Sequence, residues 1–288
     1  MRVAKHWDGT DPGGTPGRIF TASIPQERLV AEGPFLDYLT LGLKGAVATA
    51  AVVIEDFGEL LSTFTFRVGP ENRIIANGLD LIALMGFYYK QIPAFGENTD
   101  ATGNDFLGGI KIPVQAPTET EKEFLASAER TAVTNIATET ISLYGHYDED
   151  ANGKKPIHCV LLQHTSAGTA GYETLSAQIV PVGKLVGLII GSPGASGFTD
   201  TNIDVSVQRL RILADGKVHS AFNALGENTP NAPVDFVTPG PIGDMLRRYQ
   251  YYDLRPSGID AKSQRLTLQI DVQDVSDALR ILPVMEIE

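Results

Sequence analysis

The stretch from Val52 to Gly69, VVIEDFGELLSTFTFRVG, predicts two strands joined by a tight turn. β-Branched residues open it, and Asp56-Phe57-Gly58 has the composition of a turn. From Leu60 to Val68 apolar side chains fall mainly at every second position, which is the period of a strand with one buried face. The stretch therefore predicts a β-hairpin, and we expect Phe64 to lie in the core.

A similar pattern recurs in Leu210 to Gly226, LRILADGKVHSAFNALG. Gly58 then aligns with Gly216 and Phe64 with Phe222, both at an offset of 158 residues (216 − 58 and 222 − 64). Weaker matches follow in the same order on either side: residues 22–45 with 177–194, and 85–93 with 248–256. We interpret these ordered matches as a duplicated domain. We therefore expect residues 18–164 and 175–288 to superpose with these pairs aligned, and we expect Phe222, like Phe64, to lie in the core of its barrel.

Composition indicates what kind of domain is duplicated. The 29 glycines and 17 prolines fall mostly between short apolar runs, which favours the turns of an all-β protein, and 43% apolar residues suffice for a core. Two halves of about eight short strands each predict two tandem jelly-roll β-barrels, a double jelly roll, with a few short helices. The helices are expected at residues 77–87, 117–133 and 242–252, the first capped by Asn77 and the second by a Thr118–Glu121 capping box.

We expect three parts along the chain: an N-terminal arm at residues 1–17, a first jelly roll at 18–168 with an insertion at 94–138, and a second jelly roll at 169–288. We expect an arm because glycines and prolines, which disfavour regular structure, end this segment. We place the junction between the barrels at the small polar run TSAGTAG, Thr165–Gly171. Trp7, the single tryptophan, is expected to anchor the arm, either on its own domain or on a partner.

Charge and cysteine content exclude several classes of function. The net charge of −12 argues against direct nucleic-acid binding, which needs a basic face. The lone Cys159 allows no internal disulfide. The first residues hold no apolar run typical of a signal peptide, and no stretch of about 18 apolar residues predicts a membrane-spanning helix.

The histidines do not form a recognisable metal motif. A bicupin enzyme would need an H-x-H pair, and the sequence has none. His146 and His158 flank one turn and could face each other, but structural or exposed histidines are the favoured interpretation. All five histidines are His6, His146, His158, His164 and His219.

The turn Asp148–Gly153, DEDANG, matches the first half of a calcium-binding loop. The twelfth position, which should be a bidentate Glu, is Cys159, so a plain hairpin turn is favoured over a calcium site. Ser192 and Ser196 lie in GSPGASG, which lacks a nucleophile motif and is read as a turn. The sequence therefore predicts no catalytic, cofactor-binding or metal-binding residue, no cofactor, and no enzyme activity.

With two predicted barrels and the strand-turn-strand-then-helix pattern around Gly58 and Gly216, the sequence resembles the double jelly-roll major capsid proteins of tailless icosahedral viruses. This is the lineage of membrane-containing bacteriophages, related archaeal viruses and adenovirus. The segment GPENRIIANGLDLIALM, Gly69–Met85, resembles the helix-bearing segment of the phage members. The resemblance covers most of the chain, from about Arg18 to Ile287.

The resemblance implies a structural shell subunit of the virion capsid, assembled in the host cytoplasm. It implies homotrimers that form pseudo-hexameric capsomers of an icosahedral capsid. The implied partners are neighbouring capsomers and other capsid proteins such as penton and minor proteins. Whether an internal viral membrane is a further partner stays open. No direct nucleic-acid binding is expected.

Two other classes of function stay open. One is a jelly-roll binding module, such as a lectin-like or receptor-binding spike protein, which an exposed aromatic platform would favour. The tyrosines at 88–89 and 249–252 occupy repeated positions, which indicates packing instead. The other is a cupin-like enzyme, which the missing H-x-H pair disfavours.

Overall fold

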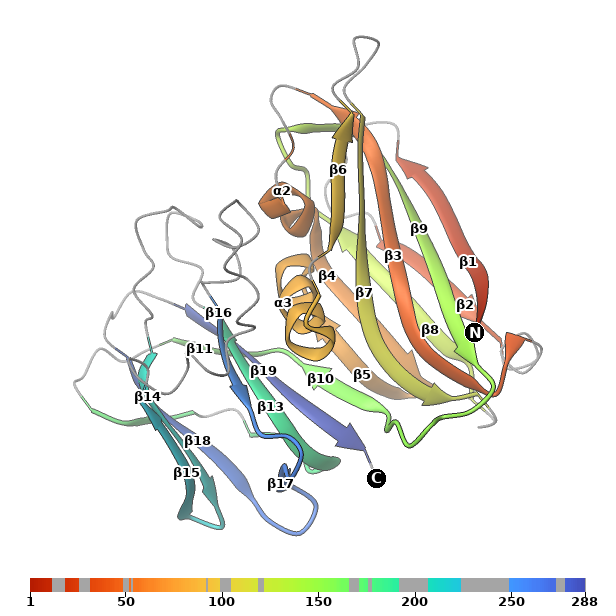
Figure 1. The fold of residues 1–288 in the computed structure, drawn as a ribbon. Helices are drawn as coiled ribbons and strands as arrows, with labels where there is room; N and C mark the ends of the chain where they lie inside the picture. The colour runs from red at the N-terminus through yellow and green to blue at the C-terminus, as the bar shows by residue number, and fades with distance from the viewer. Residues whose placement is uncertain are drawn as a thin grey trace. The chain divides into compact units, whose positions relative to one another are not determined.

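The computed structural model describes residues 1–11, 19–25, 32–48, 52, 54–91, 93–98, 105–118, 122–165, 171–175, 178–191, 207–223, 249–272 and 278–287 (Figure 1). The chain divides into two compact units, Met1–Ile157 and His158–Glu288. Both consist mainly of antiparallel strands, as predicted. The division falls ahead of the expected boundary at 168/169, because β11 (Leu162–Thr165) pairs with β19 (Ala278–Ile287) of the second unit.

The first unit is a barrel of two sheets. One sheet has the order β1-β9-β3-β7-β6, with β1 (Arg2–Asp11), β9 (Ile136–Asp148), β3 (Phe35–Val47), β7 (Asp105–Pro117) and β6 (Ala94–Asn98). The other has the order β2-β8-β4-β5, with β2 (Ile19–Ile24), β8 (Phe124–Arg130), β4 (Leu61–Val68) and β5 (Glu71–Ala76).

The second unit repeats this strand order. In one sheet β11 pairs with β19, β19 with β13 (Gly183–Gly191), and β13 with β16 (Tyr249–Asp253) and β17 (Ile259–Asp260). The other sheet has the order β12-β18-β14-β15, with β12 (Glu173–Thr174), β18 (Leu266–Val272), β14 (Val207–Ala214) and β15 (Lys217–Asn223). β10 (Ile157–Val160) lies at the division. Eight of the nine strands named in each unit thus pair in the same order, which confirms two tandem jelly rolls.

The duplication exists, but the predicted alignment at offset 158 is wrong. Residues 54–59 form a helix, α2 (Ile54–Glu59), instead of a strand and turn, and Gly58 lies inside it. Gly216 lies in the turn between β14 and β15 with φ +79°, and the turn with the same place in the first barrel holds Gly69, φ +56°, between β4 and β5. The predicted alignment therefore slipped by one strand, because successive hairpins of a jelly roll share their composition.

Strand pairing identifies the true equivalents. Phe64 on β4 faces Ala128 on β8, and Leu210 on β14 faces Ile270 on β18. Phe222, the residue predicted to match Phe64, lies on the next strand, β15. Phe64 is buried, as expected, whereas Phe222 is only partly buried against the core of the second barrel.

The helix predicted after the first hairpin is confirmed as α3 (Gly78–Tyr89). The Asn77 side chain accepts a hydrogen bond from the Asp80 amide at 2.8 Å, and the Asp80 carboxylate accepts from the Asn77 amide at 3.2 Å. This reciprocal pair is a capping box, which satisfies two amides at the helix start. The start of α3 also touches α2, because a Cβ on Gly78 would lie 2.0 Å from the Gly58 carbonyl oxygen.

We expect Gly78→Ala to destabilise the protein by about 1–3 kcal/mol, since the added methyl group forces α2 and α3 apart. Urea denaturation measures this loss. Gly109→Ala on β7 is the matched control, because its nearest atom would be an ordinary 3.9 Å away. A Gly78→Ala protein as stable as the control would show that the two helices do not need this close contact.

Three other predicted segments differ from the structure. Residues 124–130, expected in a helix, form β8, in which Phe124, Ala126, Ala128 and Arg130 alternate into the core. The supposed insertion at 94–138 therefore contains β6, β7 and β8, which are integral strands of the barrel. The helix expected at 242–252 is replaced at its end by β16, and residues 242–248 lie outside the described part. The helix prediction over β8 was wrong because the small residues at alternate positions of this strand are also common in helices.

The predicted N-terminal arm is largely a strand, since residues 2–11 form β1 and pair with β9. Trp7 packs on its own unit: it lines a small cavity with Leu41, Phe64 and Leu143 from three strands of the barrel. The interpretation that Trp7 anchors on its own domain is confirmed.

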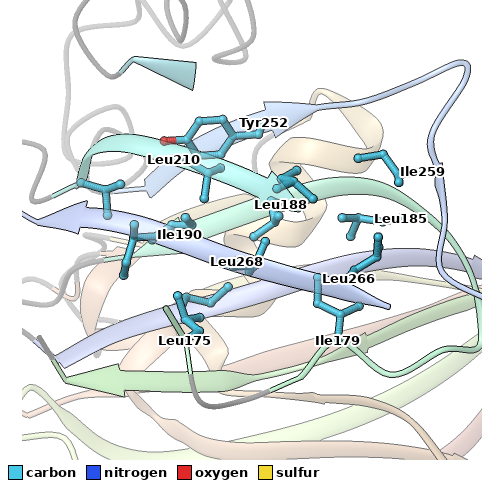
Figure 2. Packing of buried hydrophobic residues seen from close by; sticks show 14 of the residues in the cluster. Leu175, Ile179, Leu185, Leu188, Ile190, Leu210, Tyr252, Ile259, Leu266 and Leu268 are labelled. Atoms are coloured by element: carbon cyan, nitrogen blue, oxygen red, sulfur yellow. The ribbon is translucent and has the colours of Figure 1, made fainter. Parts of the chain in front are cut away.

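The second barrel shows how the two sheets form a core (Figure 2). Leu188 and Ile190 from β13 and Tyr252 from β16 pack against residues of the opposite sheet, Leu210 and Leu268 among them. All are buried. Removal of this apolar surface from water is the main term that stabilises each barrel.

Candidate functional site

A cluster of aromatic and charged side chains lies on the outer face of the β1-β9-β3-β7-β6 sheet. Leu39 and Leu41 of β3 point into the core, so Tyr38 and Thr40 face outward. Thr40 is opposite Lys111 of β7, and Tyr38 is opposite His146 of β9. The pairing of three strands therefore brings these side chains together, although they are far apart in the sequence.

Lys111 is held between two aromatic rings. Its ammonium nitrogen lies 4.0 Å from the Tyr38 ring centroid and 4.1 Å from that of Tyr89 on α3. The Tyr38 ring stacks on His146 at 4.0 Å between centroids, with 17° between the planes. Such cation–π and stacking contacts fix the α3 end against the sheet.

Burial and neighbouring charges shift the pKa values of side chains in the cluster. Lys154 pairs with Asp37 at 2.7 Å and with Asp148 at 3.6 Å. Burial, and then the charge of Lys111, lower the pKa of His146, so its imidazole is neutral at pH 7. Burial likewise lowers the pKa of Lys111 and raises that of Tyr89.

Among the described residues, the cluster lacks the third group of a catalytic triad. The His146 Nε2 atom and the Thr40 hydroxyl are 2.8 Å apart. A triad also needs a third group that orients the imidazole, and the His146 Nδ1 has no hydrogen-bond partner in the part of the chain that is described.

The other histidines contact separate groups. His6 Nε2 lies 2.6 Å from the Tyr147 hydroxyl, His164 Nε2 lies 3.1 Å from Glu173, and His219 contacts Ser220. His158 is buried in β10. Within the described ranges, no three His, Cys, Asp or Glu side chains come together as a metal site would require.

The segment Asp148–Gly153 forms a turn between β9 and β10. Asn152 and Gly153 have left-handed φ values of 49° and 75°, which Asn and Gly tolerate best. The Asp150 carboxylate accepts from the Asn152 amide at 3.3 Å, and Asp148 faces Lys154. Local hydrogen bonds and an ion pair thus account for two of its carboxylates.

We expect EDTA to leave the melting temperature of the protein unchanged, because these carboxylates have partners within the chain. Differential scanning calorimetry with and without EDTA tests this, with added Mg²⁺ as a control for ionic strength. A fall in melting temperature that calcium alone reverses would identify the turn as a calcium site.

Residues 166–170 of the predicted linker, together with Ser192 and Ser196, lie outside the described residues.

The second barrel carries a cluster that the sequence did not predict. The Tyr172 ring contacts two guanidinium groups, with its centroid 4.9 Å from the Arg209 Cζ and 3.8 Å from the Arg211 Cζ. Arg209 also pairs with Asp271 on the neighbouring strand. The alternation of residues along β14 predicts that both arginines share one face of the strand, but no local sequence signal predicts that Tyr172 contacts them.

No protein-family model matches the sequence, and no curated protein matches it. Solved structures do match. The STIV MCP, a major capsid protein, aligns with 14% sequence identity and a TM-score of 0.71, over 100% of this chain and 97% of that chain. The chain has the fold of the double jelly-roll major capsid proteins. At this identity the double jelly-roll fold is what the two chains share.

VP54 of PBCV-1, in a structure fitted into a cryo-EM reconstruction of the virophage Sputnik, has the same double jelly-roll fold. It aligns with 10% identity and a TM-score of 0.58, over 98% of this chain and 92% of that chain. The quasi-atomic model of the PBCV-1 virus capsid gives the same values. Among the described residues, no helix has the length and apolar character needed to cross a membrane.

Proposed function

We propose that this protein is the major capsid protein of an icosahedral virus, a structural subunit without enzyme activity. The observation that carries the proposal is the repeated strand order of its two barrels. It is supported by structural similarity to the STIV MCP over 100% of this chain and 97% of that chain. In this proposal the protein resides in the virion and is assembled in the host cytoplasm.

The proposed assembly is a homotrimer. Two similar barrels give a subunit with two roughly equivalent ends. Three subunits joined head to tail close a ring of six barrels, with one heterologous contact repeated three times. Such a pseudo-hexameric capsomer tiles a shell with its neighbours, with penton and minor capsid proteins as further partners.

Exposed apolar residues on the strands support a self-association role. Val3 on β1 is 52% exposed, Leu107 on β7 is 63% exposed, and Val218 on β15 is 54% exposed. β1 and β15 are edge strands of their sheets within the described residues. Apolar side chains on strand edges are suited to contact with another copy.

Imaging of the assembled particle tests the proposal. We expect a reconstruction in which this chain forms threefold units of six barrels. Val218→Lys should weaken assembly without lowering the melting temperature, and Lys217→Gln beside it is the control. A dimer, a pentamer or a lone spike of this chain in the particle would contradict the proposal and favour a binding module.

A further inference from the structure

A cavity of about 90 Å³ opens between the two sheets of the first barrel. β4 contributes Phe66 and Val68 to its wall, and β7 contributes Val114 and Ala116. Two basic side chains, Arg73 of β5 and Lys122 just before β8, complete the lining, with Pro117, Pro156 and Ile157. The whole lining belongs to the first unit.

The walls of the cavity are suited to an aliphatic group. Phe66, Val114 and Ala116 are all buried, with 0%, 2% and 5% exposure, so their surfaces toward the cavity are shielded from bulk water. Apolar spaces of this kind hold water poorly and accept small hydrocarbons.

The two cations give the cavity a preference for negative charge. Arg73 is 17% exposed and pairs through one guanidinium nitrogen with Glu71 at 2.7 Å. Its Nε atom is buried and has no acceptor among the described residues. A buried donor without an acceptor is costly, which favours a ligand that supplies one.

Lys122 has no ion pair among the residues described. Its stem packs over the Gly69 turn, where a Cβ would lie 3.1 Å from the Lys122 Cδ. No carboxylate lines the cavity. The chain has a net charge of −12, so two basic groups beside one apolar cavity make this site positive on a protein that is negative as a whole.

We propose that this cavity binds a medium-chain alkyl carboxylate. The aliphatic chain occupies the space between Phe66 and Val114, and the carboxylate accepts hydrogen bonds from Arg73 and Lys122. Charge-assisted hydrogen bonds to a carboxylate supply the selectivity, and burial of the chain supplies affinity. This inference does not depend on the capsid role.

Ligand-observed NMR titration of the full-length protein with hexanoate tests the proposal. We expect saturable binding of hexanoate. Hexan-1-ol and hexylammonium should bind about tenfold more weakly or worse, because neither carries the negative charge that the two basic side chains attract. Acetate, which has the charge but no chain, should not compete. Equal binding of the three hexyl compounds would overturn the proposal.

Variants locate the ligand. Arg73→Gln combined with Lys122→Gln should reduce hexanoate affinity to that of hexan-1-ol, and Val114→Phe should abolish binding because it fills the cavity. Lys217→Gln, an exposed lysine of the second barrel, should bind as the parent protein does. Lys122→Gln alone serves if the double variant does not fold, since Lys122 is exposed. Undiminished binding by the charge variant and by Val114→Phe would place the ligand elsewhere and refute the site.

Discussion

Replacing Glu139 with Ala is expected to destabilise the first barrel by about 3–5 kcal/mol, because it leaves a buried arginine without its counter-charge. Arg130 of β8 and Glu139 of β9 form an ion pair inside the barrel, and both side chains are 0% exposed. The Arg130 Nη2 atom donates to the Glu139 Oε2 at 2.8 Å. The two strands belong to opposite sheets, so the pair connects them.

Urea denaturation measured by Trp7 fluorescence follows this loss, because Trp7 lies in the same barrel. Glu129→Ala on the outer face of β8 is the matched control, and it should change stability by less than about 1 kcal/mol. Arg130→Met with Glu139→Leu should recover most of the loss, since removal of both charges leaves no unpaired one. A Glu139→Ala protein as stable as the Glu129→Ala control would mean that water reaches Arg130.

The sequence predicted the structure correctly where the residues that determine an element lie within that element. Asn77 and Asp80 form the capping box of α3 within four residues, and the hairpin around Gly216 has its turn residues in place. In β18, residues 266–270 alternate between buried and half-buried side chains within the strand itself. In these segments local pattern and final structure agree.

Prediction failed where the deciding contact joins distant segments. β8 was read as a helix because its alanines and charges suit one, and only pairing with β4 and β2 makes it a strand. Gly58 was read as a turn glycine, but it is buried in α2 where the start of α3 approaches it. The clusters around Lys111 and Tyr172 also depend on strand pairing. Tertiary contacts override local preference at these positions.

Three truncations distinguish the two possible alignments of the barrels. Phe64→Ala is expected to cost about 3–5 kcal/mol and Leu210→Ala about 2–5 kcal/mol, because both side chains are buried on equivalent strands. Phe222→Ala should cost less than either. Its ring is only partly buried on edge strand β15, with an edge-to-face contact at 5.1 Å from Tyr252.

Hydrogen exchange of the β4 and β14 amides measures each loss in its own barrel, so the two units need not unfold together. Phe64→Ala should have an effect toward the upper end of its range, because the ring already borders the small cavity beside Trp7 and truncation enlarges it. Phe64→Leu, which keeps most of the volume, should restore much of the stability. If Phe222→Ala matched Phe64→Ala while Leu210→Ala cost little, the offset of 158 residues would be right and the equivalence drawn from strand pairing would be wrong.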